Sequence, residues 1–120
     1  MTRLAGRTAL VTGSSRGIGA AIARRLAADG ARVVAHGRGE SEALTALAAQ
    51  AGAAIVMGDL ASGETATQVV REAFAIHGAL DILVLNAGGG KGGLVTDQPV
   101  EVIDAVLSLN LRATILATAE

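Results

Sequence analysis

Apolar residues along the chain alternate between short aliphatic runs and longer segments in which they recur at helical spacing. The short runs predict four β-strands, at residues 8–12, 32–36, 54–58 and 80–85. Between the first two runs, Ile18, Ile22 and Leu26 recur at every fourth position, which predicts an amphipathic helix over residues 17–29. Gly30 follows in the position that commonly ends a helix.

Two further helices follow from apolar faces and end signals. The first covers residues 40–51, and Gly52 closes it. Its apolar face consists of Leu44, Leu47 and Ala48. The second is expected to have Ser62 as its N-cap and to stop at Gly78. Its buried face is expected to consist of Val69, Val70, Ala73 and Phe74.

The last helix is predicted to start at Pro99, since proline is favoured in the first turn, and to continue towards Glu120. Asn110 falls on its apolar stripe, after residues such as Val106 and Leu107. A buried amide must be hydrogen-bonded. Asn110 is therefore expected either to cap or kink the helix or to organise water beside a cleft, and the spacing does not choose between these.

Strands that alternate with helices and are apolar almost throughout predict an α/β fold with a parallel sheet covered on both faces. We expect a Rossmann-type, doubly wound sheet whose first four strands lie in the order 3-2-1-4. A complete sheet of this type has about six strands. Residues 1–120 are therefore expected to form one dinucleotide-binding domain that is truncated before its last strands.

Composition and charge exclude several classes of function. The net charge is −1, with no basic block, so nucleic-acid binding is not expected. There are no cysteines, and His36 and His77 lie far apart, so neither disulfides nor a metal site are predicted. The N-terminal apolar run is too short for a signal peptide, and the uncharged stretch 43–58 is interrupted by Gln50 and glycines. A cytoplasmic protein without a membrane span is expected.

The stretch TGSSRGIG, residues 12–19, follows the first predicted strand and opens the first predicted helix. The first amides of a helix have no partner within the helix, and the helix dipole favours an anion there. Gly13 permits a sharp turn, while Gly17 and Gly19 let a pyrophosphate and the neighbouring strand approach the backbone. This context predicts a dinucleotide-binding loop rather than a turn without a ligand.

The end of the second predicted strand indicates which dinucleotide is bound. An acid about 20 residues after the glycine loop would bind the ribose 2′-hydroxyl of NAD. His36 and Gly37 stand near that position, and Arg38 follows them. Arg38 can pair with a 2′-phosphate, and Arg16 in the loop can reach the same side of the adenosine. We therefore expect NADP(H) to be preferred over NAD(H).

The third and fourth predicted strands also end in polar or small residues. Asp59 follows the third strand, and Asn86, Ala87 and Gly88 follow the fourth. Ligands of open α/β sheets bind outside the carboxyl ends of the strands, at the switch in strand order. The loops at Gly13 and Asn86 should therefore face one crevice. Asp59 is expected either to accept from an exocyclic amine or to cap the next segment.

These residues resemble the short-chain dehydrogenase/reductase family. TGSSRGIG matches the family's TGxxxGxG loop, and Leu85 to Gly88 are similar to its Asn-Asn-Ala-Gly motif, with Leu85 in place of the first asparagine. Leu109-Asn110-Leu111 resembles the helix that carries the family's catalytic asparagine. The resemblance extends from Arg3 to the last residue.

The resemblance implies a role for each matching position. Cofactor-binding residues would be Gly13, Ser15, Arg16, Gly17, Ile18, Gly19, Arg38, Asp59, Leu60, Asn86, Ala87 and Gly88. Asp59 and Leu60 would flank the adenine, and Asn86 to Gly88 would lie along the nicotinamide-side ribose. Asn110 would support a proton relay. The parent enzyme would transfer hydride between NADPH and a carbonyl or alcohol substrate, and it would form homo-oligomers, as many members do.

The sequence departs from the family by what it lacks. It contains no tyrosine, and its single lysine, Lys91, lies in a glycine-rich loop, so no Tyr-x-x-x-Lys motif is present. General acid–base chemistry on the hydride acceptor therefore has no evident residue. Three interpretations stay open: the cofactor-binding part of a larger reductase, a stand-alone dinucleotide-binding module without chemistry, or a remnant that folds poorly. A methyltransferase is disfavoured, because it usually needs an acid where Gly37 and Arg38 stand.

Overall fold

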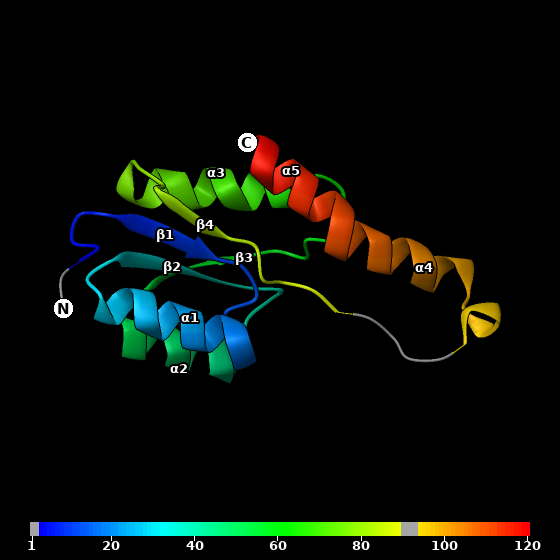
Figure 1. The fold of residues 1–120 in the computed structure, drawn as a ribbon, viewed down its shortest axis with the longest axis horizontal. Helices are drawn as coiled ribbons and strands as arrows, with labels where there is room; N and C mark the ends of the chain where they lie inside the picture. The colour runs from blue at the N-terminus through cyan, green and yellow to red at the C-terminus, as the bar shows by residue number, and fades with distance from the viewer. Residues whose placement is uncertain (1–2, 90–93) are drawn as a thin grey trace.

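The computed structural model describes residues 3–89 and 94–120 and contains a four-stranded parallel sheet (Figure 1). Its strands are β1 (Thr8–Val11), β2 (Arg32–Gly37), β3 (Ala54–Met57) and β4 (Ile82–Val84). They lie in the order β3-β2-β1-β4. The predicted fold class and strand order are therefore confirmed. The single lysine, Lys91, lies outside the described residues.

Helices cover both faces of the sheet. They are α1 (Gly17–Ala28), α2 (Glu42–Ala51), α3 (Thr65–His77), α4 (Val100–Leu107) and α5 (Ala113–Ala119), with a 3₁₀ turn η1 (Val95–Asp97) and a π-helical turn η2 (Ser108–Arg112). In Figure 1, α1 and α2 lie together on one side of the sheet and α3 and α5 on the other, while α4 projects beyond the sheet.

The core consists of two apolar clusters, one on each face of the sheet. Successive side chains of a strand point to opposite faces. Leu10, Val34 and Val56 accordingly pack with α3 and α5, while Val11, Val33 and Ala35 pack with α1 and α2. Leu44, Leu47 and Ala48 of α2 are buried, which confirms the predicted face of that helix.

The predicted apolar stripe of α1 is wrong at its first residue. Ile18 is 74% exposed, and the buried residues of the helix are Gly19, Ala20 and Ala23. Ile22 and Leu26 are only partly buried. Small residues face the sheet because the start of the helix lies very close to the loop after β1. The large aliphatic side chains are displaced to the edges of the contact.

Helix α3 differs from its prediction at its start and at one residue of its apolar face, whereas its predicted stop at Gly78 is confirmed. Its N-cap is Glu64, while Ser62 lies in the preceding turn, where its amide donates to the Asp59 carbonyl at 3.0 Å. Val69, Val70 and Ala73 are buried as expected, but Phe74 is 52% exposed. The buried residues follow a narrow stripe, and Phe74 lies at its outer border.

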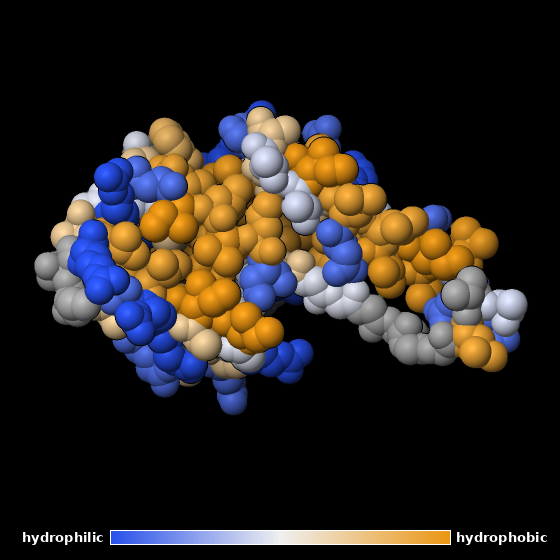
Figure 2. Space-filling model, in the orientation of Figure 1, coloured by the Kyte–Doolittle hydropathy of each residue, from blue (hydrophilic) through white to orange (hydrophobic). Residues whose placement is uncertain are grey.

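The predicted final helix is divided into α4, the π-helical turn η2 and α5. Asn110 lies in η2 and is exposed, so its predicted burial is wrong. No residue of α4 is buried, whereas Ala113 and Ala117 of α5 pack against α3. Figure 2 shows the projecting part as a mainly hydrophobic surface. Exposed apolar residues recur at spacings of four along the final helical segment, at Ile103, Leu107, Leu111 and Ile115.

The residues from Val100 to Ala119 form one continuous helical segment of 20 residues with a mean hydropathy of 1.5 over its most apolar window, of which 11% is buried. By length and composition alone this segment meets the requirement for a membrane span. The core helix of a soluble protein and a signal sequence have the same length and composition. The predicted absence of a membrane span and the predicted cytoplasmic location stay predictions.

Candidate functional site

A cleft of about 860 Å³ opens at the carboxyl ends of the strands, where parallel sheets commonly bind ligands. Most of the predicted cofactor-binding residues line it, namely Gly13, Ser15, Arg16, Ile18, Arg38, Asp59, Leu60, Asn86, Ala87 and Gly88. The loops after β1 and β4 therefore face one crevice, as predicted. Gly17, Gly19 and Asn110 are not among the lining residues. Val102, Val106 and Leu109 form an apolar wall from the final helical segment.

The glycine loop after β1 is fixed by its first two residues. Gly13 has φ +62°, and a Cβ atom there would lie 2.9 Å from the Ala87 Cα. Its amide donates to the Nδ1 atom of His36 at 3.0 Å, and the Ser14 amide donates to the His36 carbonyl at 2.9 Å. These two amides are therefore occupied within the protein. Amides that could bind an anion must come from later residues of the loop.

Those later residues form the start of α1. Its N-cap, Arg16, makes no side-chain capping hydrogen bond. The first-turn amides therefore have no side chain to satisfy them at this end, and the positive end of the helix dipole is open towards the cleft. Ser15, Arg16 and Ile18 line the cleft beside it. This arrangement suits a phosphate group.

Gly19 has a packing role. A Cβ atom at Gly19 would lie 2.2 Å from the Gly13 carbonyl oxygen and 2.6 Å from the Nδ2 atom of Asn86. No side chain fits into that space, so Gly19 allows α1 to approach the loop after β1. By contrast, Gly17 has φ +63° but open space around it, so its backbone conformation is what favours glycine.

Asn86 and Thr12 join the ends of β4 and β1. The side-chain amide of Asn86 donates to the carbonyl oxygens of Thr12 and Gly13, each at 3.2 Å. The hydroxyl of Thr12 accepts from the amides of Asn86 and Ala87, each at 3.0 Å. Thr12 is a residue whose role the sequence analysis missed. Its only signal was a hydroxyl at the end of an apolar strand.

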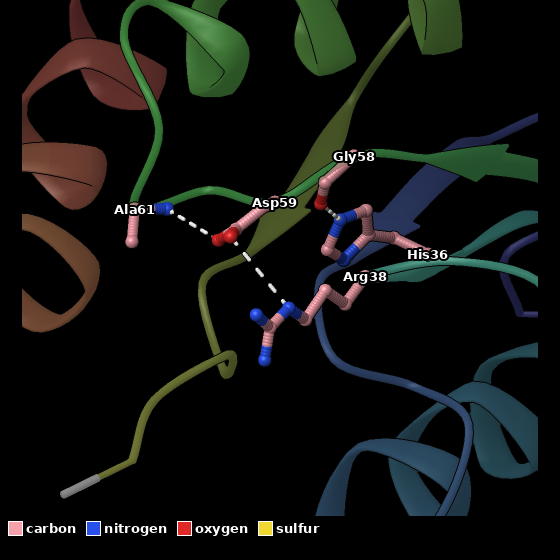
Figure 3. Close-up of polar contacts among 5 residues, drawn as sticks. All are labelled: His36, Arg38, Gly58, Asp59 and Ala61. Atoms are coloured by element: carbon pink, nitrogen blue, oxygen red, sulfur yellow. Dashed lines mark hydrogen bonds and ion pairs between the residues drawn. The ribbon is translucent and has the colours of Figure 1, made fainter. Parts of the chain in front are cut away.

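Arg38 and Asp59 meet at the other end of the cleft (Figure 3). The Nε atom of Arg38 lies 3.6 Å from one carboxylate oxygen of Asp59, and the other oxygen accepts from the Ala61 amide at 3.0 Å. Asp59 therefore caps the following turn, which is one of its two predicted roles. The Arg38 side chain is 86% exposed, so this ion pair adds little to stability and leaves most of the guanidinium accessible.

His36 is a second residue that the sequence analysis missed. It is 2% exposed, and its ring accepts from the Gly13 amide. The Nε2 atom of the ring lies 2.9 Å from the carbonyl oxygen of Gly58 (Figure 3). Burial lowers the pKa of His36 from its usual 6.5, and the hydrogen bond to Gly58 opposes that shift. A polar ring within an apolar strand run was the signal that could have drawn attention to it.

Asn110 joins the loop after β4 to the final helical segment. Its Nδ2 atom donates to the Gly89 carbonyl at 2.6 Å and to the Val106 carbonyl at 2.9 Å, while Oδ1 accepts from the Gly89 amide at 3.1 Å. Of the predicted alternatives, the structure supports the distortion of the helix, because Asn110 lies in the π-helical turn. The described residues contain no group of three side chains placed to hold a metal ion.

The fold and this cleft define an α/β protein of the doubly wound class, in which dinucleotides commonly bind at the carboxyl ends of the strands. Residues 7–120 match the short chain dehydrogenase family over nearly the whole chain, and the protein belongs to this family of oxidoreductases. The predicted family membership is thus confirmed.

Individual relatives agree with this assignment. The chain is 41% identical to the cyclic-di-GMP-binding biofilm dispersal mediator protein of Escherichia coli, over 100% of this chain and 49% of that protein. A short-chain dehydrogenase from Burkholderia cenocepacia, solved in complex with NADP, superposes with a TM-score of 0.93 at 43% identity. The match covers 98% of this chain and 50% of the Burkholderia chain. A blue fluorescent protein from a metagenomic library, solved with NADPH, gives a TM-score of 0.92 at 35% identity, with 98% and 50% covered. The chain spans about half the length of the relatives it matches.

Proposed function

We propose that this chain is the NADP(H)-binding portion of a short-chain dehydrogenase/reductase whose complete form transfers hydride between NADPH and a carbonyl or alcohol substrate. The observation that carries the proposal is the single cleft formed by the glycine loop, the open start of α1 and the loop after β4. The complexes of similar proteins with NADP and NADPH support it.

In this proposal the pyrophosphate binds at Ser15, Arg16, Gly17 and Ile18, because the amides of Gly13 and Ser14 are already occupied. Asp59 and Leu60 lie beside the adenine. Asn86, Ala87 and Gly88 follow the nicotinamide-side ribose. When bound, the cofactor supplies the hydride, and the residues of this chain bind and orient it.

Arg38 is proposed to select NADP(H) by pairing with the 2′-phosphate, with Arg16 on the same side. Its support is the exposed guanidinium at the cleft, held through its Nε atom by Asp59 so that the terminal nitrogens are available. Titration of the chain with NADPH and with NADH, followed by fluorescence, tests this assignment.

The Arg38→Ala variant should bind NADPH about 10- to 100-fold more weakly, with NADH binding little changed, because a charge-assisted hydrogen bond to a phosphate is lost. Arg24→Ala is the matched control, because Arg24 is exposed on α1 and bonds to Gln50 instead. An equal loss for both nucleotides in Arg38→Ala would contradict the NADP(H) preference.

A second function is favoured by one observation. The sequence has no tyrosine, so the residue that would exchange a proton with the substrate in the family is absent from these 120 residues. A stand-alone dinucleotide-binding module without chemistry fits that absence. Reading the coding sequence downstream of Glu120 distinguishes the two: a Tyr-x-x-x-Lys motif supports the reductase, and a stop codon directly after Glu120 supports the module.

Two further parts of the proposal concern partners and location. The exposed apolar stripe of the final helical segment supports association into a homo-oligomer. Sedimentation velocity at several protein concentrations tests it, and a concentration-independent monomer would contradict it. A cytoplasmic location, without nucleic acid or membrane as partner, completes the proposal, and fractionation of cells that express the natural gene tests it.

A further inference from the structure

The imidazole of His36 spans two segments that the sheet keeps apart. His36 lies near the carboxyl end of β2, between β1 and β3. Its Nδ1 atom is 3.0 Å from the amide nitrogen of Gly13, which follows β1, and its Nε2 atom is 2.9 Å from the carbonyl oxygen of Gly58, which follows β3. The ring thus links both walls of the cleft from a buried position. Figure 3 shows its contact with Gly58.

The two partners define the protonation state of the ring. A backbone amide can only donate a hydrogen bond and a backbone carbonyl can only accept one. Nδ1 must therefore carry the lone pair and Nε2 the hydrogen. In the imidazolium form, two N–H groups would face each other at Nδ1, and the bond from Gly13 would be lost. The arrangement accepts only the neutral Nε2–H tautomer.

The backbone of His36 reinforces this arrangement. Its amide donates to the Ser14 hydroxyl at 2.9 Å, and its carbonyl accepts from the Ser14 amide at 2.9 Å. The glycine loop is therefore attached to β2 through the backbone of His36. Its connection across to Gly58 runs through the ring.

We propose that neutral His36 is a positioning residue of the cleft, whose ring sets the separation between the glycine loop and the segment after β3. The hydrogen bonds of the ring orient Gly13 and hold Gly58 directly before Asp59 and Leu60. The consequence for the cofactor rests on the proposed function. The side chain of His36 fixes the distance between the loop that binds the pyrophosphate and the end of the cleft that binds the adenine.

A pH dependence follows from this geometry. Among the described residues, the charged groups at this end of the sheet are Arg16 after β1, Arg38 and Glu40 after β2, and Asp59 after β3. Arg38 and Asp59 pair with each other. Burial lowers the pKa of His36 below 6.5 in the folded protein.

Between the folded-state pKa of His36 and its unfolded value of 6.5, the unfolded chain binds more protons than the folded chain. The stabilisation by neutral His36 is therefore complete above about pH 6.5 and is lost as the pH falls towards the folded-state pKa. The affinity for a dinucleotide should decrease in the same direction, because protonation removes the acceptor for Gly13.

Two substitutions separate the two hydrogen bonds. His36→Asn keeps an acceptor at the position of Nδ1 but is too short to reach Gly58. His36→Gln keeps a donor near the position of Nε2 but has no acceptor for Gly13. His77→Gln is the matched control, because His77 lies at the end of α3, away from the cleft.

The experiment combines ¹⁵N NMR of the histidine rings, hydrogen exchange at the Gly13 amide and NADPH titration from pH 8 downwards, all on the 120-residue chain. We expect the Nε2–H tautomer of His36 at pH 8. We expect Gly13 exchange to be about fivefold faster in His36→Gln and nearly unchanged in His36→Asn. NADPH affinity of the unsubstituted chain and of His77→Gln should fall about fivefold once the pH is low enough for the NMR signals to show a protonated His36 ring, whereas neither His36 variant should show that fall.

An imidazolium or an Nδ1–H tautomer of His36 at pH 8 would overturn the proposal. Equal Gly13 exchange in His36→Gln and His36→Asn would do the same. If a variant does not fold, the tautomer in the unsubstituted chain still decides. If NADPH does not bind at any pH, the proposed function fails, while the ring and exchange measurements continue to test His36.

Discussion

Two regions of this chain are similarly apolar in sequence but differ in burial. In the first, residues 8–57, all four residues of β1 are buried, and α2 buries its apolar face completely. In the second, residues 82–119, β4 is only partly buried and α4 contains no buried residue. The difference lies in what surrounds each region rather than in its hydrophobicity.

The neighbours of each strand explain the contrast. β1 pairs with both β2 and β4, and helices lie above and below it. Within the described residues, β4 pairs with β1 alone, so one of its edges has no strand beside it. α4 leaves the sheet altogether (Figure 1). Apolar patterning therefore identifies elements, and the layer next to each element decides whether it is buried.

The largest effect is expected from truncating matched leucines in the two regions. Leu10 in β1 is fully buried, and Leu107 in α4 is 52% exposed. Leu10→Ala should reduce the free energy of unfolding by about 2–5 kcal/mol, because it opens a cavity in the core. Leu107→Ala should change it by less than about 0.5 kcal/mol. Urea denaturation followed by circular dichroism measures both, and equal losses would show that α4 is covered in solution.

A smaller effect on stability, together with a loss of NADPH binding, is expected at Gly19, which lets α1 pack closely against the loop after β1. Gly19→Ala places a methyl group 2.2 Å from the Gly13 carbonyl, so α1 must shift away from the loop. It should cost about 1–3 kcal/mol of stability and weaken NADPH binding at least about tenfold. Gly39→Ala, with nothing within 4 Å of its added Cβ, is the control and should bind as the unsubstituted chain does. Tight binding by Gly19→Ala would refute the packing role.

The smallest effect is expected where the two regions meet at Asn110. Asn110→Ala removes its bonds to Gly89 and Val106, but these groups are exposed and water replaces the protein partner. Stability should fall by less than about 1 kcal/mol. The readout is local: the Gly89 amide should exchange faster, while the amides of β1 stay protected. Thr118→Ala, which removes a hydroxyl bond within α5, should leave Gly89 unaffected.

Much of the fold could be predicted from the sequence, because strand runs, helix spacing and terminal glycines are local signals. Gly52 and Gly78, for example, adopt the left-handed conformation that ends α2 and α3. The predictions that failed concerned burial, which depends on tertiary packing rather than on local sequence. Phe74 and Asn110 follow a helical apolar stripe, yet they are exposed because the packed face is narrower than the stripe.

The residues of the candidate site likewise fall into those that the sequence predicts and those that it does not. The glycine loop and Asn86 were predictable, because their residue types and positions after strands are specific. The ring of His36 was not, since its partners Gly13 and Gly58 are backbone groups more than twenty residues away in either direction. Backbone partners leave no signal in the sequence. Only the strand order brings them to one ring.

The final helical segment forms the apolar wall of the cleft, and its two ends differ in how firmly they are attached to the rest of the structure. The far end of that segment is held to α3 by the ion pair between Arg71 and Glu120. Arg112 in η2 donates to the carbonyl of Gly63, which lies just before α3. From the π-helical turn at Asn110 to Val102 at the mouth of the cleft is about 12 Å along the helix axis. Because Val102 is further than Leu109 from this turn, any rotation of α4 about the turn would displace Val102 more than Leu109.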